Sequence, residues 1–473
     1  MLYGRQEELS FLNNSYQSIG GQLLVLYGRR RTGKTATLLQ FAKGKPCAYF
    51  SCSESTSRSQ LAALATLLQQ KKDASNHQAL LLRRPKEFTD WGEALTQIPE
   101  IPGKGKKILI LDEFTNLLKS SPDFLHVLRD IWETRLQYDN LMIILCTSSV
   151  QLAEEELLYP YSPLGECATG TLKMDALDHY GSAAFFSSWA PGERLTALSL
   201  LGGIPYYLSS FDSDKPLEYN IKTRLLGKDS PLFREPDHLL HSQLREISIY
   251  NAILEALALG NCKLSQIYEK TGIGKSKLTV YLKNLSDLGL VGRELPIHDG
   301  LREPVYVPHG IYRLKDPFFR FWYANVFPHR SLLEQGEADL IYDKILQPKL
   351  AEYSSDAFLH ACRDYLMRCN KSGKLPFAYT EIGGFWNKEE AFPIMATDAK
   401  NTSFLVGECF ASERLLTLPY LNKTIAKFKA KKKGHQAYFY YIFSLSGFAE
   451  EVRQPALRQG IELISGAQVF SAF

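Results

Sequence analysis

The stretch LLVLYGRRRTGKTATLLQF, residues 23–41, decides the fold of the first part of this chain. An apolar run of strand length leads into a loop of glycine and arginine, and a segment of helical period follows. Residues 28–35 spell G-x-x-x-x-G-K-[ST] at the junction. Backbone N–H groups of such a loop surround a phosphate, and the helix N-terminus adds positive charge. We therefore predict a nucleoside triphosphate site; the alternative is a basic turn before an ordinary helix.

Each part of the loop has an expected task. Gly28 and Gly33 let the backbone curl around the β-phosphate. Lys34 would bridge the β- and γ-oxygens, and the Thr35 hydroxyl would serve as a ligand of Mg²⁺. The residues expected to contact ATP are Gly28, Arg29, Arg30, Arg31, Thr32, Gly33, Lys34, Thr35 and Ala36.

A second apolar run, KILILDEF at residues 107–114, ends in two carboxylates. Open α/β sheets bind ligands beyond the carboxyl ends of their strands. Asp112 is expected to hold Mg²⁺, and Glu113 to act as the general base on the attacking water. An Asp-Glu pair after a strand is otherwise a helix N-cap, but together with the loop it indicates a hydrolytic site.

Four apolar runs, residues 22–28, 47–52, 107–114 and 141–149, alternate with segments of helical period, which predicts a parallel α/β sheet. The last run ends in Thr147, Ser148 and Ser149, whose hydroxyls face the γ-phosphate or the water in one interpretation and only form a turn in the other. We assign Ser148 to the catalytic site.

Composition sets broad limits. At 473 residues the chain is expected to form roughly three units of about 150 residues. A net charge of +4 is too small to indicate a polyanion partner, and eight scattered cysteines without C-x-x-C spacing indicate reduced thiols. No segment approaches the roughly 18 apolar residues of a membrane span, so we expect a cytoplasmic protein without a membrane partner.

The segment between the predicted sheet and the winged-helix pattern is expected to be mostly helical. GGIPYYL, residues 202–208, breaks a helical region, and residues 241–316 show two helical segments at a Gly-rich turn followed by a hairpin, which is a winged-helix pattern. The aromatic residues 318–327 are expected to be a packed helix. From about residue 347, helices alternate with strands.

In these motifs the chain resembles the prokaryotic archaeal-type P-loop ATPases of the AAA+/STAND group. The resemblance rests on YGRQEEL, GRRRTGKT, LILDEF, SPLGECATGTLKM, GGIPYYL and YRLKDPFFRFWYANVFPHRSLLE. It implies an α/β P-loop NTPase core at residues 1–176, a helical lid at 177–240, a winged helix at 241–316, a helical linker at 317–346, and a C-terminal α/β domain at 347–473. The last domain resembles PD-(D/E)xK nucleases, of the kind called DUF234.

The resemblance also assigns residues outside the loop. Gly4 and Arg5 are expected near the adenine and ribose, and Gly203 and Pro205 in the step that closes the lid over the nucleotide. One family position differs: Cys167 stands where an arginine that could reach the γ-phosphate is usual. Without that guanidinium we expect slow hydrolysis, unless one of the three loop arginines substitutes.

The C-terminal region departs further from its family. Pro393 stands at the position of the metal-binding aspartate and Phe410 at that of the catalytic lysine, which leaves Glu408 alone. One carboxylate is too little to hold Mg²⁺ and orient a water. We predict a scaffold or binding role, although a shifted alignment that uses Asp398 and Lys400 stays open.

Two basic segments are candidates for DNA contact. The second helix of the helix-turn-helix carries Lys275, Lys277 and Lys283, Asn284 is a candidate for base contact, and Arg293 follows in the wing. The run from Lys427 to Lys433 is the densest basic stretch. A spacer or protein contact explains the winged helix equally well, and a solvated helix end explains the run.

Together these observations predict a nucleotide-dependent switch that binds ATP and Mg²⁺ and hydrolyses ATP slowly. The alternatives are an ATP-regulated nuclease and a winged-helix DNA-binding regulator. The protein partner is open and includes a second copy of the chain.

Overall fold

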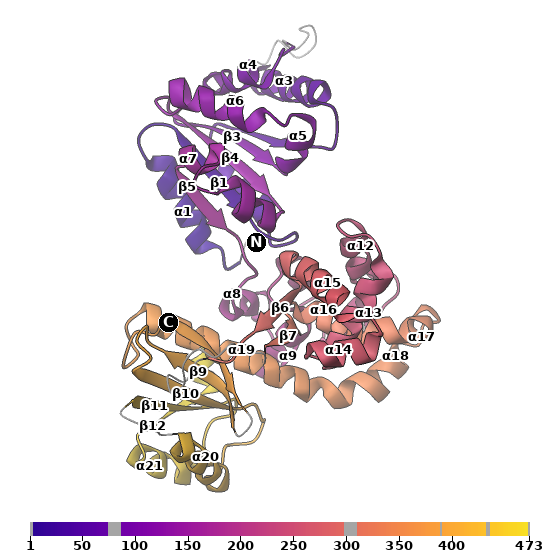
Figure 1. Ribbon diagram of the computed structural model, residues 1–473, viewed down its shortest axis with the longest axis vertical. Coiled ribbons are helices and arrows are strands. Elements are labelled where there is room, and N and C mark those ends of the chain that lie inside the picture. The colour runs from indigo at the N-terminus through magenta and orange to yellow at the C-terminus, as the bar shows by residue number, and fades with distance from the viewer. Residues whose placement is uncertain (1–2, 74–86, 298–309, 388–389, 432–435, 472–473) are drawn as a thin grey trace. The chain divides into compact units, whose positions relative to one another are not determined.

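The computed structural model describes residues 3–73, 87–297, 310–387, 390–431 and 436–471. The chain divides into two compact units (Figure 1). Unit 1 is Met1–Ala176 with Ile204–Tyr206, and unit 2 is Leu177–Gly203 with Tyr207–Phe473. The short return of residues 204–206 adds part of the GGIPYYL motif to unit 1.

Unit 1 is a parallel sheet of five strands in the order β2-β3-β4-β1-β5. Four strands lie at the predicted apolar runs; the fifth, β5, was not predicted from the sequence. The strands are β1 (Gln22–Tyr27), β2 (Cys47–Ser51), β3 (Lys107–Asp112), β4 (Leu141–Thr147) and β5 (Gly170–Lys173).

Helices cover both faces of this sheet, as Figure 1 shows. Strand residues alternate between the faces: Leu23 and Val25 pack in one apolar cluster, and Leu24 and Leu26 in the other. The first cluster also includes residues of α3 to α7, the second residues of α1 and α2. The helices are α1 (Gln6–Gln17), α2 (Lys34–Ala42), α3 (Ser57–Asp73), α4 (Trp91–Leu95), α5 (Thr115–Ser120), α6 (Phe124–Ile131) and α7 (Pro163–Cys167).

Unit 2 begins with short helices, as its Pro and Gly breaks predict. Its first helices are α8 (His179–Ala183), α9 (Pro191–Leu201), α10 (Pro205–Leu208), which starts in unit 1, α11 (Leu217–Asn220) and α12 (Glu235–His241). The aromatic stretch is a packed helical segment, as predicted, since Phe318, Phe319, Phe321, Trp322 and Tyr323 are fully buried.

The winged helix is formed as predicted. It consists of α13 (Ile247–Ala258), α14 (Leu264–Thr271), α15 (Lys275–Asp287) and the antiparallel strands β6 (Val291–Glu294) and β7 (Ile311–Leu314). Residues 303–308 of the expected hairpin lie outside the described residues. The helices α16 (Pro317–Phe321), α17 (Arg330–Glu334), α18 (Ala338–Ile341) and α19 (Leu350–Lys371) follow.

The C-terminal part is a mixed sheet in the order β12-β11-β10-β9-β8, with β8, β9 and β10 antiparallel and β10, β11 and β12 parallel. Its elements are β8 (Glu381–Trp386), β9 (Ala391–Thr397), β10 (Ser403–Phe410), α20 (Leu418–Lys431), β11 (Ala437–Ser444), α21 (Glu450–Arg458), β12 (Ile461–Ser465) and α22 (Gly466–Phe470).

Two expectations from composition concern the whole chain. All eight cysteines are free thiols. Among the described helices, none combines the length and the apolar character needed to cross a bilayer.

Candidate nucleotide-binding site

The loop between β1 and α2 adopts a curled backbone. Arg31 and Gly33 both have left-handed φ angles, +70° and +89°. Gly28 has φ +156°, and a Cβ there would lie 2.2 Å from the carbonyl oxygen of Met174. Glycine at 28 is therefore required by a close backbone approach, so the first residue of the motif also meets a steric need of the fold.

Lys34 opens α2 and turns back into the loop. Its Nζ donates hydrogen bonds to the carbonyl oxygens of Gly28 at 2.7 Å and Arg29 at 2.9 Å. Burial lowers the pKa of Lys34, while the nearby carboxylates of Glu113 and Asp112 act in the opposite direction. The ammonium thus lies inside the curved loop, where proteins with this motif bind a phosphate.

Asp112, at the end of β3, accepts hydrogen bonds from two hydroxyl groups. Thr35 Oγ1 donates to Asp112 Oδ2 at 2.6 Å, and Tyr49 OH donates to the same oxygen at 2.7 Å. The other carboxylate oxygen, Oδ1, accepts from the backbone N–H of Glu113 at 3.0 Å. The structure thus brings together Thr35 and Asp112, the two residues predicted to hold the metal.

Glu113 follows at φ +52°, a left-handed angle that is rare for a side chain of this kind. The turn directs its carboxylate to the end of β4, where Ser148 Oγ donates to Glu113 Oε2 at 2.8 Å. The backbone N–H of Ser148 donates to the same oxygen at 3.3 Å. Strain of about 1–3 kcal/mol is typical of such positions at functional sites. Of the three hydroxyls at the end of β4, Ser148 is the one that contacts Glu113.

The residues at this edge fit Mg²⁺. The ion prefers oxygen ligands and usually keeps several waters and phosphate oxygens. Asp112 is 4% exposed and its Oδ2 accepts from two hydroxyls, so a hydroxyl and a carboxylate already lie at contact distance. Among the described residues no group of three or more His, Cys, Asp or Glu could hold a metal by itself.

Two neighbours of Asp112 were not predicted from the sequence. Tyr49 lies on β2, and Cys146 lies directly opposite Asp112 in the register of β3 and β4. Burial raises the pKa of Cys146 well above its ordinary value, so the thiol stays protonated beside the carboxylate. A tyrosine and a cysteine within apolar strand runs carry no motif, and only the strand order brings them here.

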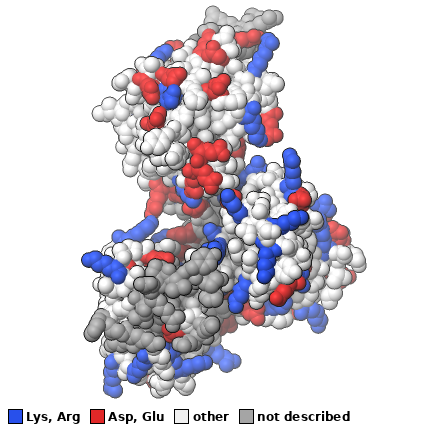
Figure 2. Space-filling model, in the orientation of Figure 1, with Lys and Arg blue, Asp and Glu red and all other residues white. Residues whose placement is uncertain are grey.

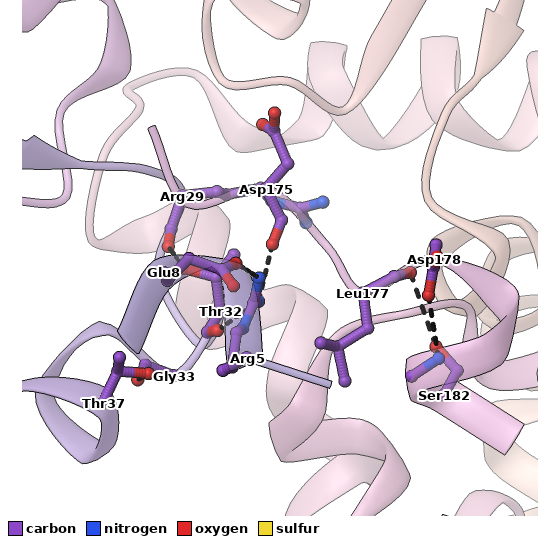
Figure 3. Close-up of polar contacts among 11 residues, drawn as sticks. Arg5, Glu8, Arg29, Thr32, Gly33, Thr37, Asp175, Leu177, Asp178 and Ser182 are labelled. Atoms are coloured by element: carbon purple, nitrogen blue, oxygen red, sulfur yellow. Dashed lines mark hydrogen bonds and ion pairs between the residues drawn. The ribbon is translucent and has the colours of Figure 1, made fainter. Parts of the chain in front are cut away.

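Arg5, expected from the resemblance near the adenine and ribose, is held by contacts within unit 1. Its side chain is 4% exposed and donates from Nη2 to the carbonyl oxygens of Thr32 at 2.8 Å and Asp175 at 2.7 Å (Figure 3). Nη1 donates to Glu8 Oε1 at 2.5 Å. The guanidinium is therefore engaged with the protein's own backbone and with Glu8. Gly4, next to it, has φ +64°.

The return of the chain at Pro205 and Tyr206 lies against the loop. A Cβ on Gly33 would lie 3.7 Å from Cγ of Pro205, and the guanidinium of Arg31 stands 4.1 Å from the ring centroid of Tyr206. Such a cation–π contact restrains an otherwise exposed arginine. Arg30 and Ala36 are exposed.

Cys167 does not face a phosphate. It is 8% exposed, belongs to the apolar cluster on the α3 to α7 face, and donates from Sγ to the carbonyl of Pro163 at 2.8 Å. Burial raises its pKa to about 11. This position supplies packing, and no cation of α7 stands in for the family arginine.

In the C-terminal sheet, the register of β9 and β10 pairs Gly407 with Ile394 and so sets Pro393 beside Glu408. Glu408 forms an ion pair with Lys427 of α20, whose ammonium also lies 4.6 Å from the ring centroid of Phe392. Burial raises the pKa of Glu408, and Lys427 opposes the rise. The carboxylate is thus neutralised within the domain.

The shifted alignment does not rebuild a site around Glu408. Asp398 accepts from the backbone N–H of Thr402 at 2.8 Å and from its hydroxyl at 2.7 Å, and so closes the turn between β9 and β10. Lys400 lies exposed in the same turn. Asp398 lies beside Ser403, five residues from Glu408 along β10, which corresponds to about 17 Å.

The winged helix presents positive charge. Lys275, Lys277 and Lys283 on α15 and Arg293 on β6 are exposed. On the face drawn in Figure 2, Lys and Arg side chains gather over the part of unit 2 that holds α14, α15 and β6. Asn284 is partly buried, and its amide nitrogen donates to Tyr250 OH at 2.7 Å.

The lysines of the basic run that begins at Lys427 have different environments. Lys427 is committed to Glu408, whereas Lys429 is exposed. Lys432 and Lys433 lie outside the described residues. The predicted backbone-tracking patch therefore loses its first member.

Three family models match the chain. Residues 2–211 match an ATPase domain predominantly from Archaea, residues 251–292 the bacterial regulatory protein, arsR family, and residues 322–416 DUF234, archaeal and bacterial proteins of unknown function. The uncharacterized protein MJECL04 of Methanocaldococcus jannaschii is 29% identical over 408 residues, which covers 86% of this chain and 87% of that protein.

Two solved structures match part of this chain. The Walker-type ATPase PABY2304 of Pyrococcus abyssi has a TM-score of 0.49 and 22% identity, covering 68% of this chain and 95% of that one. The ORC2 protein of Aeropyrum pernix has a TM-score of 0.43 and 17% identity, covering 73% and 95%. The family models and the loop motif together indicate that the chain contains an ATPase domain of the archaeal type, a helix-turn-helix segment and a DUF234 region.

Proposed function

We propose that this protein binds ATP and Mg²⁺ in the loop of residues 28–35 and acts as a nucleotide-dependent switch with slow hydrolysis. One observation carries the proposal: the hydroxyl of Thr35 donates to the carboxylate of Asp112 at 2.6 Å, and Asp112 is close enough to the buried ammonium of Lys34 to influence its pKa. Hydroxyl, carboxylate and ammonium are the groups that hold a metal and the β- and γ-phosphates.

Lys34 and α2 would bind the phosphates. The ammonium exchanges its two carbonyl partners, Gly28 and Arg29, for phosphate oxygens, which are stronger acceptors because they are charged. The first N–H groups of α2 point out of the helix and add donors on the same side. A bound Mg²⁺ would neutralise phosphate charge, with Thr35 and Asp112 as its protein ligands.

Glu113 would accept the proton of the attacking water. Its carboxylate is half-buried, and Ser148 holds one of its oxygens by two hydrogen bonds. Fixing one oxygen leaves the other to orient a water, which is the task of a general base. In this proposal Ser148 positions Glu113 and does not itself react.

We expect slow turnover because of where the arginines near the loop lie and because Cys167 replaces the family arginine. Cys167 is a core residue, so α7 offers no cation to the γ-phosphate. Arg31 is restrained over Tyr206, and Arg30 is exposed. Arginine fingers raise hydrolysis by about 10³–10⁵, so a bound nucleotide whose γ-phosphate none of these arginines contacts is long-lived. A long-lived ATP state suits a switch.

Comparing the chain with ATP·Mg²⁺, with ADP·Mg²⁺ and without nucleotide tests the switch. Limited proteolysis should give a pattern with ATP that differs from the other two, and Lys34→Ala should give the nucleotide-free pattern throughout. Identical patterns with ATP and ADP would leave an ATPase whose nucleotide state is not the signal.

DNA binding is the second candidate function, and it is favoured by the exposed Lys275, Lys277 and Lys283 on α15. Lysines at one helix end suit phosphate contacts, which bind without reading sequence. The triple Lys→Gln variant should bind duplex DNA at least about tenfold more weakly at low salt. Changing Lys215, Lys344 and Lys349, three exposed lysines elsewhere in unit 2, is the matched control. Equal losses in both variants would leave only general charge attraction.

For the C-terminal region we propose a scaffold or binding role. Pro393 and Phe410 stand where a nuclease would place its metal-binding aspartate and its lysine, and the remaining carboxylate, Glu408, is paired with Lys427. A neutralised pair fits a structural contact better than metal binding. The region's partner, whether another protein or a second copy, is left to experiment.

A further inference from the structure

Arg5 joins three segments that are far apart in the sequence. It stands just before α1 and donates to Glu8 within α1, to Thr32 in the phosphate loop, and to Asp175 after β5. Figure 3 shows the guanidinium between these partners. A single nitrogen, Nη2, serves both backbone carbonyls, so the positions of Thr32 and Asp175 depend on the same group.

The Thr32 carbonyl is placed by the loop's unusual backbone. Its neighbours Arg31 and Gly33 are both left-handed. The Thr32 hydroxyl also donates to the Arg29 carbonyl at 2.8 Å, which braces the loop internally. A change of backbone angles at residues 31–33 when a phosphate enters would turn the Thr32 carbonyl, and with it the guanidinium that it holds.

Asp175 lies where the chain leaves unit 1. β5 ends at Lys173, the N–H of Met174 donates to the Tyr27 carbonyl at 2.7 Å, and unit 1 ends at Ala176. Unit 2 starts with Leu177, and Asp178 caps α8 through the Gly181 N–H at 2.8 Å. Only Ala176 and Leu177 separate the residue held by Arg5 from this cap.

We propose that Arg5 is a positioning residue that couples the phosphate loop, through the Thr32 and Asp175 carbonyls, to the segment that leaves unit 1. The inference rests on the proposed nucleotide site and adds the route by which its state reaches the rest of the chain. Both Nη2 donors and one Nη1 donor of Arg5 are used by these contacts within the protein.

Hydrogen–deuterium exchange on the full chain tests the coupling. In the wild type, ATP·Mg²⁺ should slow exchange at least about threefold both in residues 28–37 and in residues 172–178. Arg5→Lys keeps the charge but replaces the planar fork by one ammonium. It should keep the protection of residues 28–37 and lose that of residues 172–178.

Glu8→Gln is the matched control, since it removes the carboxylate and keeps both carbonyl contacts of Arg5. It should retain both protections. An unchanged response of residues 172–178 in Arg5→Lys would overturn the coupling. If neither segment of the wild type responds to ATP, the nucleotide site itself is wrong, so the two failures are distinguishable.

A second measurement covers the case in which Arg5→Lys does not fold. Titrating the wild type with ATP·Mg²⁺ should change exchange in residues 28–37 and in residues 172–178 with the same midpoint. Different midpoints, or a response confined to the loop, would contradict the coupling without any variant.

Discussion

The hydroxyl of Thr35 donates a 2.6 Å hydrogen bond to Oδ2 of Asp112, joining the first turn of α2 to the end of β3. The two residues are 77 positions apart in the sequence. Parallel strands and the helix that follows β1 bring them to the same edge of the sheet. The proposed nucleotide site depends on this contact.

Asp112→Asn should remove the effect of Mg²⁺ on ATP binding. The amide keeps the shape and accepts from Thr35, but it lacks the charge that holds a divalent cation. Affinity with Mg²⁺ should fall at least about tenfold, or about 1.4 kcal/mol, to the level measured with a chelator. Tyr49→Phe, which removes the other hydroxyl on Oδ2, should keep the Mg²⁺ effect. A Mg²⁺ effect that survives in Asp112→Asn would place the metal elsewhere.

Glu113→Gln should retain ATP and stop hydrolysis. The amide preserves the hydrogen bond from Ser148 but does not accept a proton, so the rate should fall by about 10²–10⁴ with affinity nearly unchanged. Ser148→Ala should lower the rate less, since it removes one contact to the base. Wild-type turnover should already lie below the roughly 1–100 s⁻¹ of kinases. Phosphate release measured with excess ATP decides between these outcomes.

The loop, the strands β1 to β4 and the pair Asp112 and Glu113 could be predicted because short-range patterns encode them: apolar runs, glycines and a motif at fixed spacing. β5 was missed because its half-buried residues make no apolar run. The roles of Tyr49, Arg5 and Cys167 depend on strand order and on packing between distant segments, which one sequence does not display. Asn284 illustrates the same limit, since its partner Tyr250 lies on another helix.

Asp364, on α19, should make the stability of unit 2 depend on pH. Burial raises the pKa of its carboxyl from 3.8 to about 6; the N–H of His179 and Arg368 oppose the rise, and Asp178 adds to it. The folded state therefore binds this proton more tightly than the unfolded state. The ionised carboxylate costs stability above pH 6, on the order of 3 kcal/mol, and the cost disappears as the pH falls towards 3.8.

Asp364→Asn should consequently raise the melting temperature relative to the wild type at pH 7.5, and the gain should shrink between pH 6 and pH 4. His179, whose pKa burial lowers to about 4, titrates in both proteins and largely cancels in the difference. Scanning calorimetry at four pH values gives the comparison. A gain that grows on acidification would reverse the assigned direction.

The C-terminal region should not cleave DNA. Glu408 is paired with Lys427, and Asp398 belongs to a turn at the other end of β10, so these two carboxylates do not meet at one metal site. Single- and double-stranded DNA should stay intact with Mg²⁺ or Mn²⁺, with or without ATP, and Glu408→Ala should change nothing in that assay. Cleavage that Glu408→Ala abolishes would restore the nuclease, and cleavage lost only in Asp398→Ala or Lys400→Ala would reveal a relocated site.

The most direct test is calorimetric titration of ATP·Mg²⁺ into the wild type, Lys34→Ala and Lys43→Ala. Lys34 lies within the loop, whereas Lys43 is exposed just after the other end of α2 and serves as the matched control. We expect saturable binding to the wild type and Lys43→Ala, and loss of most affinity in Lys34→Ala. Equal affinities for the wild type and Lys34→Ala would contradict the nucleotide site.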